Sequence, residues 1–324
     1  MKRRAFLRLA ASAAALPAIG QSAVAQVWPI RTVRLLVGFP PGGGADAAAR
    51  IVANRLSEIW GQPVVVENRG GAGGNIAINA AAHSSPDGYT MALAITAPAI
   101  YGFLLGSLSY DPIIDLAPVT LIGTYPTILA VSNSSLIKSV QEYIDTAKSN
   151  PTKVTFASPG VGTTGHLAGE LFKRMAGVDI THVPYRGVGA GGMTDLMAGR
   201  VDSMFNTTGS LLQAVKSGQL RGLGVSSRQR FETAPELPAI AETVPGYVAD
   251  SWYGIYVPAK TPTPIVQKMH DDIVAALDEA DVRRRFEPLG VAVGGSTPAE
   301  MAARARAATD LWGPVIKAAG IKTE

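Results

Sequence analysis

The sequence predicts an α/β protein with two doubly wound lobes joined by extended crossing segments. Strand-like runs alternate with helix-like runs, and this order favours mainly parallel sheets with helices on both faces. The alternation stops at a long extended segment, residues 119–131, and then starts again. A chain of 324 residues is long enough for two domains, and no low-complexity or Pro/Gly/Ser-rich linker separates them.

The first lobe is expected to begin with a buried strand at residues 32–38 and a helix at 45–60, whose apolar residues recur on one face. A strand at 63–67, a helix at 75–82 and a strand at 90–95 complete the unit. Parallel strands need such crossover helices between them, so we expect helices on both faces of the sheet.

The same pattern returns after the long extended segment. In chain order the expected elements are a helix at 139–149, a strand at 153–157, a helix at 166–176, a strand at 180–184, a helix at 192–198, a strand at 201–206, a helix at 210–217, a strand at 222–226 and amphipathic helices at 264–279 and 298–319. Residues 119–131 and 222–226 are the expected crossings between lobes. The predicted lobes are residues 26–125 plus 228–324 and residues 126–227.

The first 25 residues are predicted to be an export signal. Basic residues are followed by an Ala/Leu-rich stretch at 7–19 and by small residues at 23–25, so cleavage is expected near Ala25. The Arg3-Arg4 pair also resembles a twin-arginine signal. No later stretch is apolar for long enough to span a membrane. We therefore expect a mature periplasmic protein that begins near residue 26.

Charge and cysteine content exclude several kinds of function. The chain has 29 basic and 25 acidic residues, and the signal accounts for four basic residues, which leaves 25 of each sign in the mature protein. A balanced chain gives no support to nucleic-acid binding. Cysteine is absent, so disulfides, thiolate nucleophiles and cysteine metal sites are excluded.

Two glycine-rich turns each lead from a predicted strand into a predicted helix. The first covers Gly38–Asp46 and the second covers Ser158–His166. Such a turn exposes unpaired N–H groups at the positive end of the helix dipole, which suits a carboxylate or phosphate. We therefore predict a cleft that grips a small anion from both sides. A purely structural turn remains the alternative for each.

Motif details argue against a nucleotide as the anion. The first turn lacks the Gly-Lys-Ser/Thr ending of a P-loop. The second matches G-x-G-x-x-G over Gly160–Gly165, but no acidic residue closes the next predicted strand, residues 180–184, where a dinucleotide ribose would bind. A dinucleotide remains a minor alternative, and we expect no cofactor.

Other polar residues stand where open α/β sheets bind ligands. Asn206 and Thr96 each end a predicted strand. Arg186 follows another strand and could pair with an anion, or it could simply solvate a loop. A third glycine-rich segment, Asn68–Asn75, is expected to pack against the first turn, with direct ligand contact as the alternative.

Groupings typical of catalysis are sparse. The chain contains no G-x-S-x-G elbow and no H-E-x-x-H motif. Its four histidines are scattered without the spacing of metal ligands, so no metal site is expected. His166 opens a predicted helix and is the strongest candidate for a general base if the protein were an enzyme.

A series of short segments in fixed order resembles one known family. The segments are Trp28–Arg31, Phe39–Gly43, Val64–Arg69, Gly71–Gly74, Pro86–Thr90, Tyr110–Pro112, His166–Phe172, His182–Tyr185 and Leu311–Trp312. Together they resemble the periplasmic solute-binding subunits of tripartite tricarboxylate transporters, also called the Bordetella uptake gene family. The resemblance covers nearly all of the mature chain.

The resemblance implies a Venus-flytrap fold of the type II periplasmic binding protein kind. Its lobes would close over a small organic carboxylate held largely by backbone N–H groups and water, and its partners would be two integral membrane subunits. With the residues selected above, the expected ligand-binding set is Phe39, Pro41, Gly42, Gly43, Asp46, Thr96, Ser158, Gly160, Gly162, Thr163, His166, Arg186 and Asn206. The loop at 185–192 departs from the family pattern, so the ligand itself cannot be taken from relatives.

The sequence thus predicts a monomeric periplasmic binding protein that captures a small carboxylate and delivers it to a membrane transporter, without chemistry of its own. Two alternatives stay open. One is an exported enzyme acting on a carboxylate, with His166 as its base. The other is a ligand-sensing subunit that presents its closed form to a signalling receptor.

Overall fold

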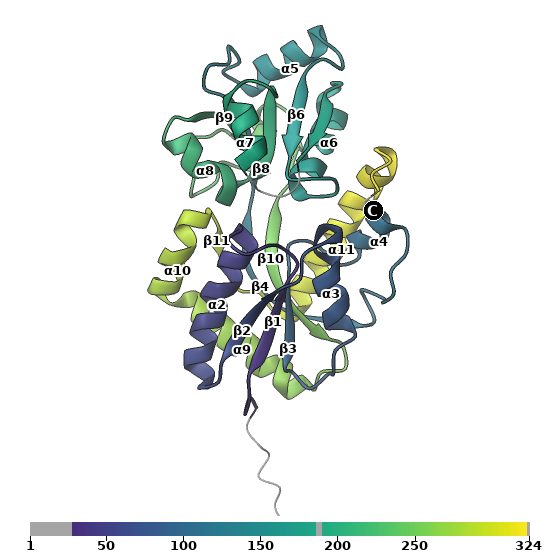
Figure 1. The fold of residues 1–324 in the computed structure, drawn as a ribbon, viewed down its shortest axis with the longest axis vertical. Helices are drawn as coiled ribbons and strands as arrows, with labels where there is room; N and C mark the ends of the chain where they lie inside the picture. The colour runs from purple at the N-terminus through teal and green to yellow at the C-terminus, as the bar shows by residue number, and fades with distance from the viewer. Residues whose placement is uncertain (1–27, 186–189, 323–324) are drawn as a thin grey trace, which may run out of the picture.

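Two β-sheets, one above the other in Figure 1, form the framework of the protein. The computed structural model describes residues 28–185 and 190–322. The first sheet has the order β11-β4-β10-β3-β1-β2 and the second the order β7-β6-β8-β5-β9. The strands of the first sheet are β1 (Val33–Val37), β2 (Val64–Asn68), β3 (Thr90–Ala94), β4 (Leu116–Tyr125), β10 (Ser251–Pro258) and β11 (Ala292–Val293). Those of the second are β5 (Thr127–Ser132), β6 (Thr155–Ser158), β7 (Thr181–Pro184), β8 (Ser203–Thr207) and β9 (Leu220–Val225).

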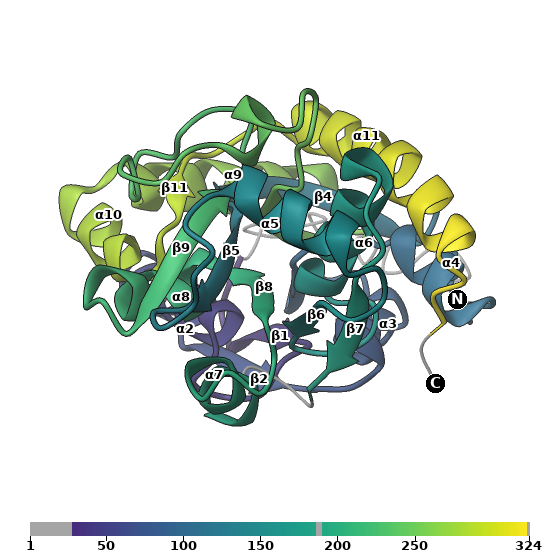
Figure 2. The same cartoon turned by 90° about the horizontal axis from the view of Figure 1, so that it is seen from above.

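Helices cover both faces of each sheet, as Figures 1 and 2 show. One face of the first sheet packs against α2 (Gly44–Trp60), α9 (Thr263–Asp278) and α10 (Ala280–Phe286), and the other against α3 (Asn75–Ala82), α4 (Ile100–Leu105) and α11 (Pro298–Ala318). On the second sheet, α5 (Val140–Ser149) and α6 (Thr164–Ala176) lie opposite α7 (Ala190–Met197) and α8 (Thr208–Lys216). Short 3-10 helices are η1 (Ala72–Gly74), η2 (Ile240–Glu242) and η3 (Glu287–Leu289).

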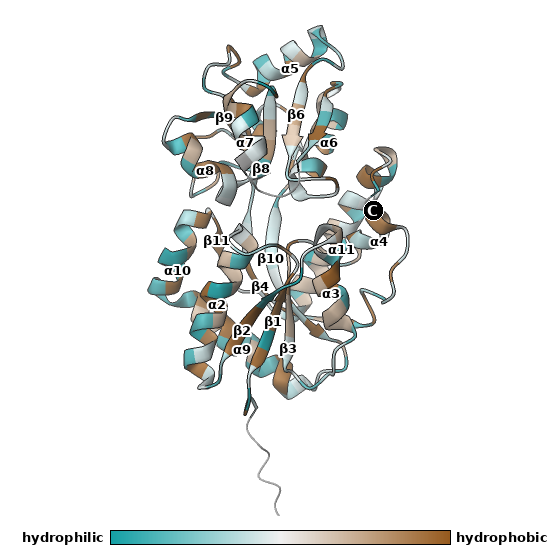
Figure 3. Ribbon diagram, viewed as in Figure 1, coloured by the Kyte–Doolittle hydropathy of each residue, from teal (hydrophilic) through white to brown (hydrophobic). Residues whose placement is uncertain are grey.

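Strand β5 shows why both faces must be covered. Ile128 and Ala130 pack into the cluster beneath α8, whereas Leu129 and Val131 pack into the cluster beneath α5 and α6. Successive side chains of a strand point to opposite faces, so an unbroken apolar run needs a partner layer on each side. Coloured by hydropathy, the strands in Figure 3 are mostly brown or white, and teal residues gather on the outer helices.

The predicted two-lobed, doubly wound α/β architecture is confirmed, and so is the first predicted crossing. Strand β4 of the first sheet ends at Tyr125, Pro126 follows, and β5 of the second sheet begins at Thr127. We call each sheet with its helices a lobe. The boundaries predicted for the lobes in the sequence stay a prediction. Among the described residues, no helix combines the length and apolar character that a membrane span requires.

Three expectations about the sheets were wrong. The sheets are mixed rather than mainly parallel, because the chain leaves the first lobe along β4 and returns along β10, and these strands run antiparallel to each other. Strand β10 itself was missed: it is buried over its whole length, so it lacks the alternation that reveals a half-buried strand. Residues 222–225 of the second predicted crossing belong to β9, an edge strand of the second sheet, and the chain reaches the first sheet only at Ser251.

One buried serine ties the two crossings together at the hinge. Ser226 is fully buried, and its Oγ accepts the N–H of Thr127 at 2.8 Å and donates to the carbonyl of Ala249 at 3.0 Å. Its backbone N–H donates to the Thr127 carbonyl, and its carbonyl accepts the Ala249 N–H. The outgoing and returning segments are therefore fastened to one another where the chain passes between the lobes.

Replacing this serine should destabilise the protein measurably. In Ser226→Ala the Thr127 N–H keeps its burial but loses its acceptor, and a buried unpaired group costs about 1–3 kcal/mol. We expect that loss in the free energy of unfolding, measured by urea denaturation. Ser227→Ala is the matched control, because Ser227 Oγ bonds only the carbonyl of exposed Gln229. Equal effects of the two substitutions would contradict the role given to Ser226.

Candidate ligand-binding cleft

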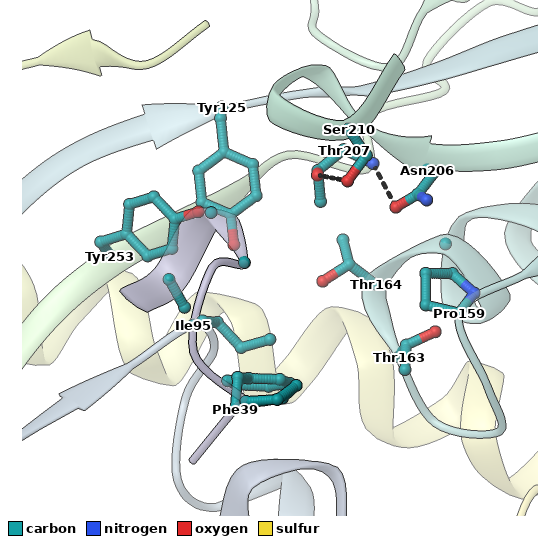
Figure 4. Close-up of a pocket in the computed structure, with 15 residues that line it drawn as sticks. Phe39, Ile95, Tyr125, Pro159, Thr163, Thr164, Asn206, Thr207, Ser210 and Tyr253 are labelled. Atoms are coloured by element: carbon teal, nitrogen blue, oxygen red, sulfur yellow. Dashed lines mark hydrogen bonds between the residues drawn. The ribbon is translucent and has the colours of Figure 1, made fainter. Parts of the chain in front are cut away.

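A cleft lies between the two lobes, at the carboxyl ends of strands from both sheets (Figure 4). Its volume is about 110 Å³. The described residues that line it are Phe39, Pro40, Gly43, Gly44, Ala45, Ile95, Tyr125, Pro159, Thr163, Thr164, Gly165, Asn206, Thr207, Ser210 and Tyr253. They come from the β1–α2, β6–α6 and β8–α8 turns, from the end of β3 and from the hinge strands. A molecule in this cleft would touch both lobes and the hinge.

The first loop presents the start of α2 to the cleft. Gly43 is the N-cap of this helix, and a glycine has no side chain with which to cap it. The N–H groups of Gly44 and Ala45 have no acceptor inside the helix, because the first intrahelical bond is donated by Ala47. Both residues line the cleft, so these donors lie at its surface.

Asp46 holds the first loop in shape. The aspartate is 3% exposed, and its carboxylate accepts hydrogen bonds from the Gly42 N–H at 2.9 Å, from Arg50 and from Asn68. Burial alone would raise the pKa of Asp46, but these three donors outweigh it and hold the pKa below its usual value. Because the charge is matched inside the loop, the carboxylate stabilises the turn without projecting a negative charge into the cleft.

The second loop repeats the arrangement on the other lobe. Thr163 is the N-cap of α6, yet its Oγ1 donates to the carbonyl of Gly160 at 2.7 Å and does not cap the helix. The N–H groups of Thr164 and Gly165 therefore have no intrahelical acceptor, and both residues line the cleft.

In the second loop, His166 has the role that Asp46 has in the first. Its Nδ1 accepts the Gly162 N–H at 3.0 Å, which assigns the neutral ring as the Nε2–H tautomer. The ring stacks on His182, with centroids 3.8 Å apart, and the Nε2 of His182 lies 2.7 Å from the Oγ of Ser158. Burial, followed by the neighbouring His182 and Lys173, lowers the pKa of His166 to about 3. The ring is thus neutral near pH 7 and its lone pair is engaged.

A third helix start, that of α8, faces the same cleft and was missed in the sequence. Its N-cap is Thr207, whose Oγ1 pairs with the Oγ of Ser210 at 3.1 Å and leaves the helix uncapped. The signal was present: Thr207-Thr208-Gly209-Ser210 repeats the Thr-Thr-Gly of the second loop at the same helix positions. The helix was expected to begin two residues later, at 210, and Asn206-Thr207-Thr208 was taken for the end of a strand.

Two helices that begin away from the cleft carry side-chain caps. On α5, Ser139 Oγ accepts the Glu142 N–H at 3.1 Å, and on α11, Thr297 Oγ1 accepts the Glu300 N–H at 3.2 Å. Such caps are the usual way in which the first turn of a helix is satisfied. Side-chain caps are missing at α3, α4, α9 and α10 as well as at α2, α6 and α8, and the last three of these helices begin at the cleft. At α8 the N–H of Thr208 donates to the carbonyl of Pro126 at 3.1 Å, so the N–H groups that give the cleft an electropositive lining are mainly those of α2 and α6.

The remaining walls are aromatic and aliphatic. Tyr125 from β4 and Tyr253 from β10 pack with ring centroids 4.4 Å apart, and each lies on a strand that leads into the hinge. Phe39 and Ile95 complete the first-lobe side in Figure 4. Among the described lining residues none carries a charged side chain, so the polar recognition here comes from N–H groups, hydroxyls and one amide.

The structure places the predicted site residues in two groups. Phe39, Gly43, Thr163 and Asn206 line the cleft. The second group lies behind or beside the described lining and comprises Pro41, Gly42, Asp46, Thr96, Ser158, Gly160, Gly162 and His166. Arg186 lies outside the described residues. Ile95, Ser210 and the two tyrosines were not predicted, since their approach depends on how the lobes and the hinge strands fold together.

Comparison with known proteins agrees with this arrangement. A model of the tripartite tricarboxylate transporter family receptor matches residues 48–321. The chain belongs to that family. It is 34% identical to protein BugT of Bordetella pertussis over 301 residues, which cover 92% of each chain.

Solved structures extend the comparison. The periplasmic binding protein BugD is 30% identical and superposes with a TM-score of 0.80, covering 91% of this chain and all of that one. An R. palustris protein whose structure holds adipate is 36% identical, with a TM-score of 0.83, and covers 91% of this chain and all of that one. The expected family and fold are thereby confirmed, and the chain is a solute-binding receptor of the periplasmic type.

Acid should loosen the second loop, because protonated His166 would turn an N–H toward the N–H of Gly162. Its folded pKa of about 3 lies below the ordinary 6.5, so its contribution to stability is complete above pH 6.5 and is lost as the pH falls toward 3. At pH 4.5 we expect this group to cost about 2–3 kcal/mol of unfolding free energy. Urea denaturation between pH 7 and 4.5 measures the loss.

The control for this prediction is His166→Asn. The Oδ1 of asparagine can accept the same N–H but does not titrate, so the variant should lose stability less steeply over the same pH range. Parallel pH dependence in the two proteins would show that His166 is not responsible.

Proposed function

We propose that this receptor captures a small organic carboxylate in the interlobe cleft and delivers it to integral membrane transporter subunits. The observation that carries the proposal is the convergence of three uncapped helix starts on one cleft without charged side chains in its described lining. Helix N-termini bind anions through unpaired N–H groups and the helix dipole. The adipate in the structure of a relative supports a carboxylate as the anion.

Binding would proceed by closure of the two lobes over the ligand. N–H groups at Gly43, Gly44 and Ala45 on one lobe, and at Thr164 and Gly165 on the other, would approach the carboxylate from both sides. A hydrogen bond to a charged group contributes about 1.5–3 kcal/mol, and a few of them reach the roughly −8 kcal/mol of micromolar affinity. Closure excludes water and strengthens each of these bonds.

The proposal includes features that only the sequence supports. These are cleavage of an export signal near Ala25, lobe boundaries after residues 125 and 227, and a monomeric receptor. It assigns ligand contact to Phe39, Gly43, Thr163 and Asn206. It gives Asp46 and His166 the task of shaping the loops.

The geometry around His166 argues against the alternative of an exported enzyme. A general base needs a free lone pair within reach of the substrate. The Nδ1 lone pair of His166 accepts the Gly162 N–H, and the other ring nitrogen faces Glu170 at 3.8 Å. We therefore propose that the receptor performs no chemistry on its ligand.

A thermal-shift panel tests the function directly. It would hold aliphatic mono-, di- and tricarboxylates, acidic amino acids, aromatic carboxylates and NAD. A ligand at 100 times its dissociation constant stabilises the protein by about 2.7 kcal/mol, which shifts the melting temperature visibly. We expect one class of carboxylate to do so. Stabilisation by NAD with no response to any carboxylate would overturn the proposal.

A pair of substitutions at one glycine isolates a single backbone donor. Gly43 has φ −80°, which proline adopts, and an added Cβ would meet only the Pro40 carbonyl at 3.6 Å. Gly43→Pro should weaken carboxylate binding by about 10- to 100-fold, because one N–H to a charged group is lost. Gly43→Ala keeps that N–H and should bind normally. Calorimetric titration decides, and equal affinities of the two variants would remove Gly43 from the site.

A further inference from the structure

A second cavity lies within the first lobe, apart from the interlobe cleft. It is bounded by α11, by β4 and β10, and by the turns that precede α4 and β4. Its volume is about 290 Å³, against about 110 Å³ for the cleft, and the two share no described lining residue. Helices α4 and α11 lie side by side at this edge of the lobe in Figures 1 and 2. We call this space the lateral cavity.

Most of the wall of the lateral cavity is apolar and fixed in shape. Three proline rings, those of Pro98, Pro112 and Pro118, line it together with aliphatic side chains from β4 and α11. The turn that carries Ile113 is held by Asp111, whose Oδ1 accepts the Ile113 N–H at 2.8 Å. Ile113 is nevertheless 79% exposed, so the cavity meets solvent on this side. A preformed apolar wall with an open mouth is typical of a small-molecule site.

One buried polar group in this wall lacks a partner. Tyr256 of β10 lines the lateral cavity and is 3% exposed, and its Oη has no hydrogen-bond partner among the described residues. Buried tyrosines elsewhere are satisfied. The hydroxyl of Tyr143 lies 2.7 Å from Ser203 Oγ, and that of Tyr247 donates to a backbone carbonyl at 2.9 Å. An unpaired buried hydroxyl is therefore a departure from the pattern of this protein and of proteins in general.

The unpaired hydroxyl specifies the polar feature that an occupant must have. An acceptor that reaches Tyr256 Oη would relieve the cost of burying this group unpaired. A single water suits the place less well, because a buried water needs about two to four polar partners and the lining is mostly apolar. An acceptor oxygen carried by an apolar body meets both requirements.

The rim of the lateral cavity indicates an occupant without net charge. Arg306 and Asp310 both line it and lie one helical turn apart on α11, so their charges oppose each other. A single charge in the cavity would be attracted by one of them and repelled by the other. It would also have to leave water for a mostly apolar site, which is costly for an ion.

We propose that the lateral cavity is a second ligand site of the receptor, which takes a small uncharged ring compound whose carbonyl or hydroxyl oxygen accepts a hydrogen bond from Tyr256 Oη. The flat faces of the three prolines and of Tyr256 suit a ring, and the volume admits one ring with a short substituent. The site is independent of the carboxylate function proposed above, because it shares no described lining residue with the cleft.

The first test removes the hydroxyl and leaves the ring. Tyr256→Phe loses no hydrogen bond seen in the described structure, so its melting temperature should equal or exceed that of the unaltered protein. The probes are acetophenone and ethylbenzene, which share a ring and a two-carbon substituent and differ in the carbonyl. In a ligand-observed NMR titration we expect the unaltered receptor to bind acetophenone about five- to tenfold more tightly than ethylbenzene. Tyr256→Phe should bind the two about equally.

A second pair of variants locates the binding. Ala302 lines the lateral cavity, and Ala302→Leu should fill part of it and weaken both probes by at least about tenfold. Ala303→Leu is the matched control, because Ala303 is the next residue of the same helix, is exposed and does not line the cavity. It should bind both probes as the unaltered receptor does.

Three results would overturn the proposal. Neither probe binds, or acetophenone keeps its preference in Tyr256→Phe, or Ala302→Leu binds both probes normally and so places them elsewhere. Sedimentation equilibrium covers a different occupant: a dimer that acetophenone dissociates would assign the lateral cavity to a contact between two copies of the chain. None of these results bears on carboxylate binding in the cleft, which the thermal-shift panel tests separately.

Discussion

The first backbone N–H groups of a helix must find acceptors, and the cleft depends on where this protein leaves that requirement unmet. At α5 and α11 a serine or threonine caps the helix, as expected at a surface. At α2 and α6 the stabilising contact is moved behind the helix start, where Asp46 and His166 accept the N–H of the residue before the N-cap. The turns are thus held in shape, although the first N–H groups of α2 and α6 have no side-chain cap.

Much of this could be read from the sequence because glycine turns between strand and helix are local features. The two loops, the doubly wound lobes and the first crossing depend on short-range patterns, and they were predicted. Strand β10 was not predicted, because a strand that is buried on both faces lacks the alternation of polar and apolar residues by which strands are recognised. The α8 start was overlooked because Thr207-Thr208-Gly209-Ser210 has one glycine and no obvious turn, although it repeats the triplet of the second loop.

Side chains that line the cleft were harder to predict than the loops. Tyr125 and Tyr253 lie far apart in sequence and meet only because β4 and β10 pair at the hinge. Conversely, Asp46 and His166 were selected for their position in the loops, and the structure shows them facing inward to Gly42 and Gly162. Sequence position indicates proximity to a site, but the direction of a side chain depends on the surrounding packing.

A receptor that recognises an anion through its backbone has an unusual relation to mutation. Most substitutions change a side chain and leave the N–H of the residue in place, so the anion contacts proposed at Gly44, Ala45, Thr164 and Gly165 would persist through most single changes, provided that the turns keep their shape. Residues such as Ile95 and Ser210 can vary meanwhile. Over evolutionary time, changes in such side chains could therefore alter which acid is bound, while the backbone donors for a carboxylate are kept.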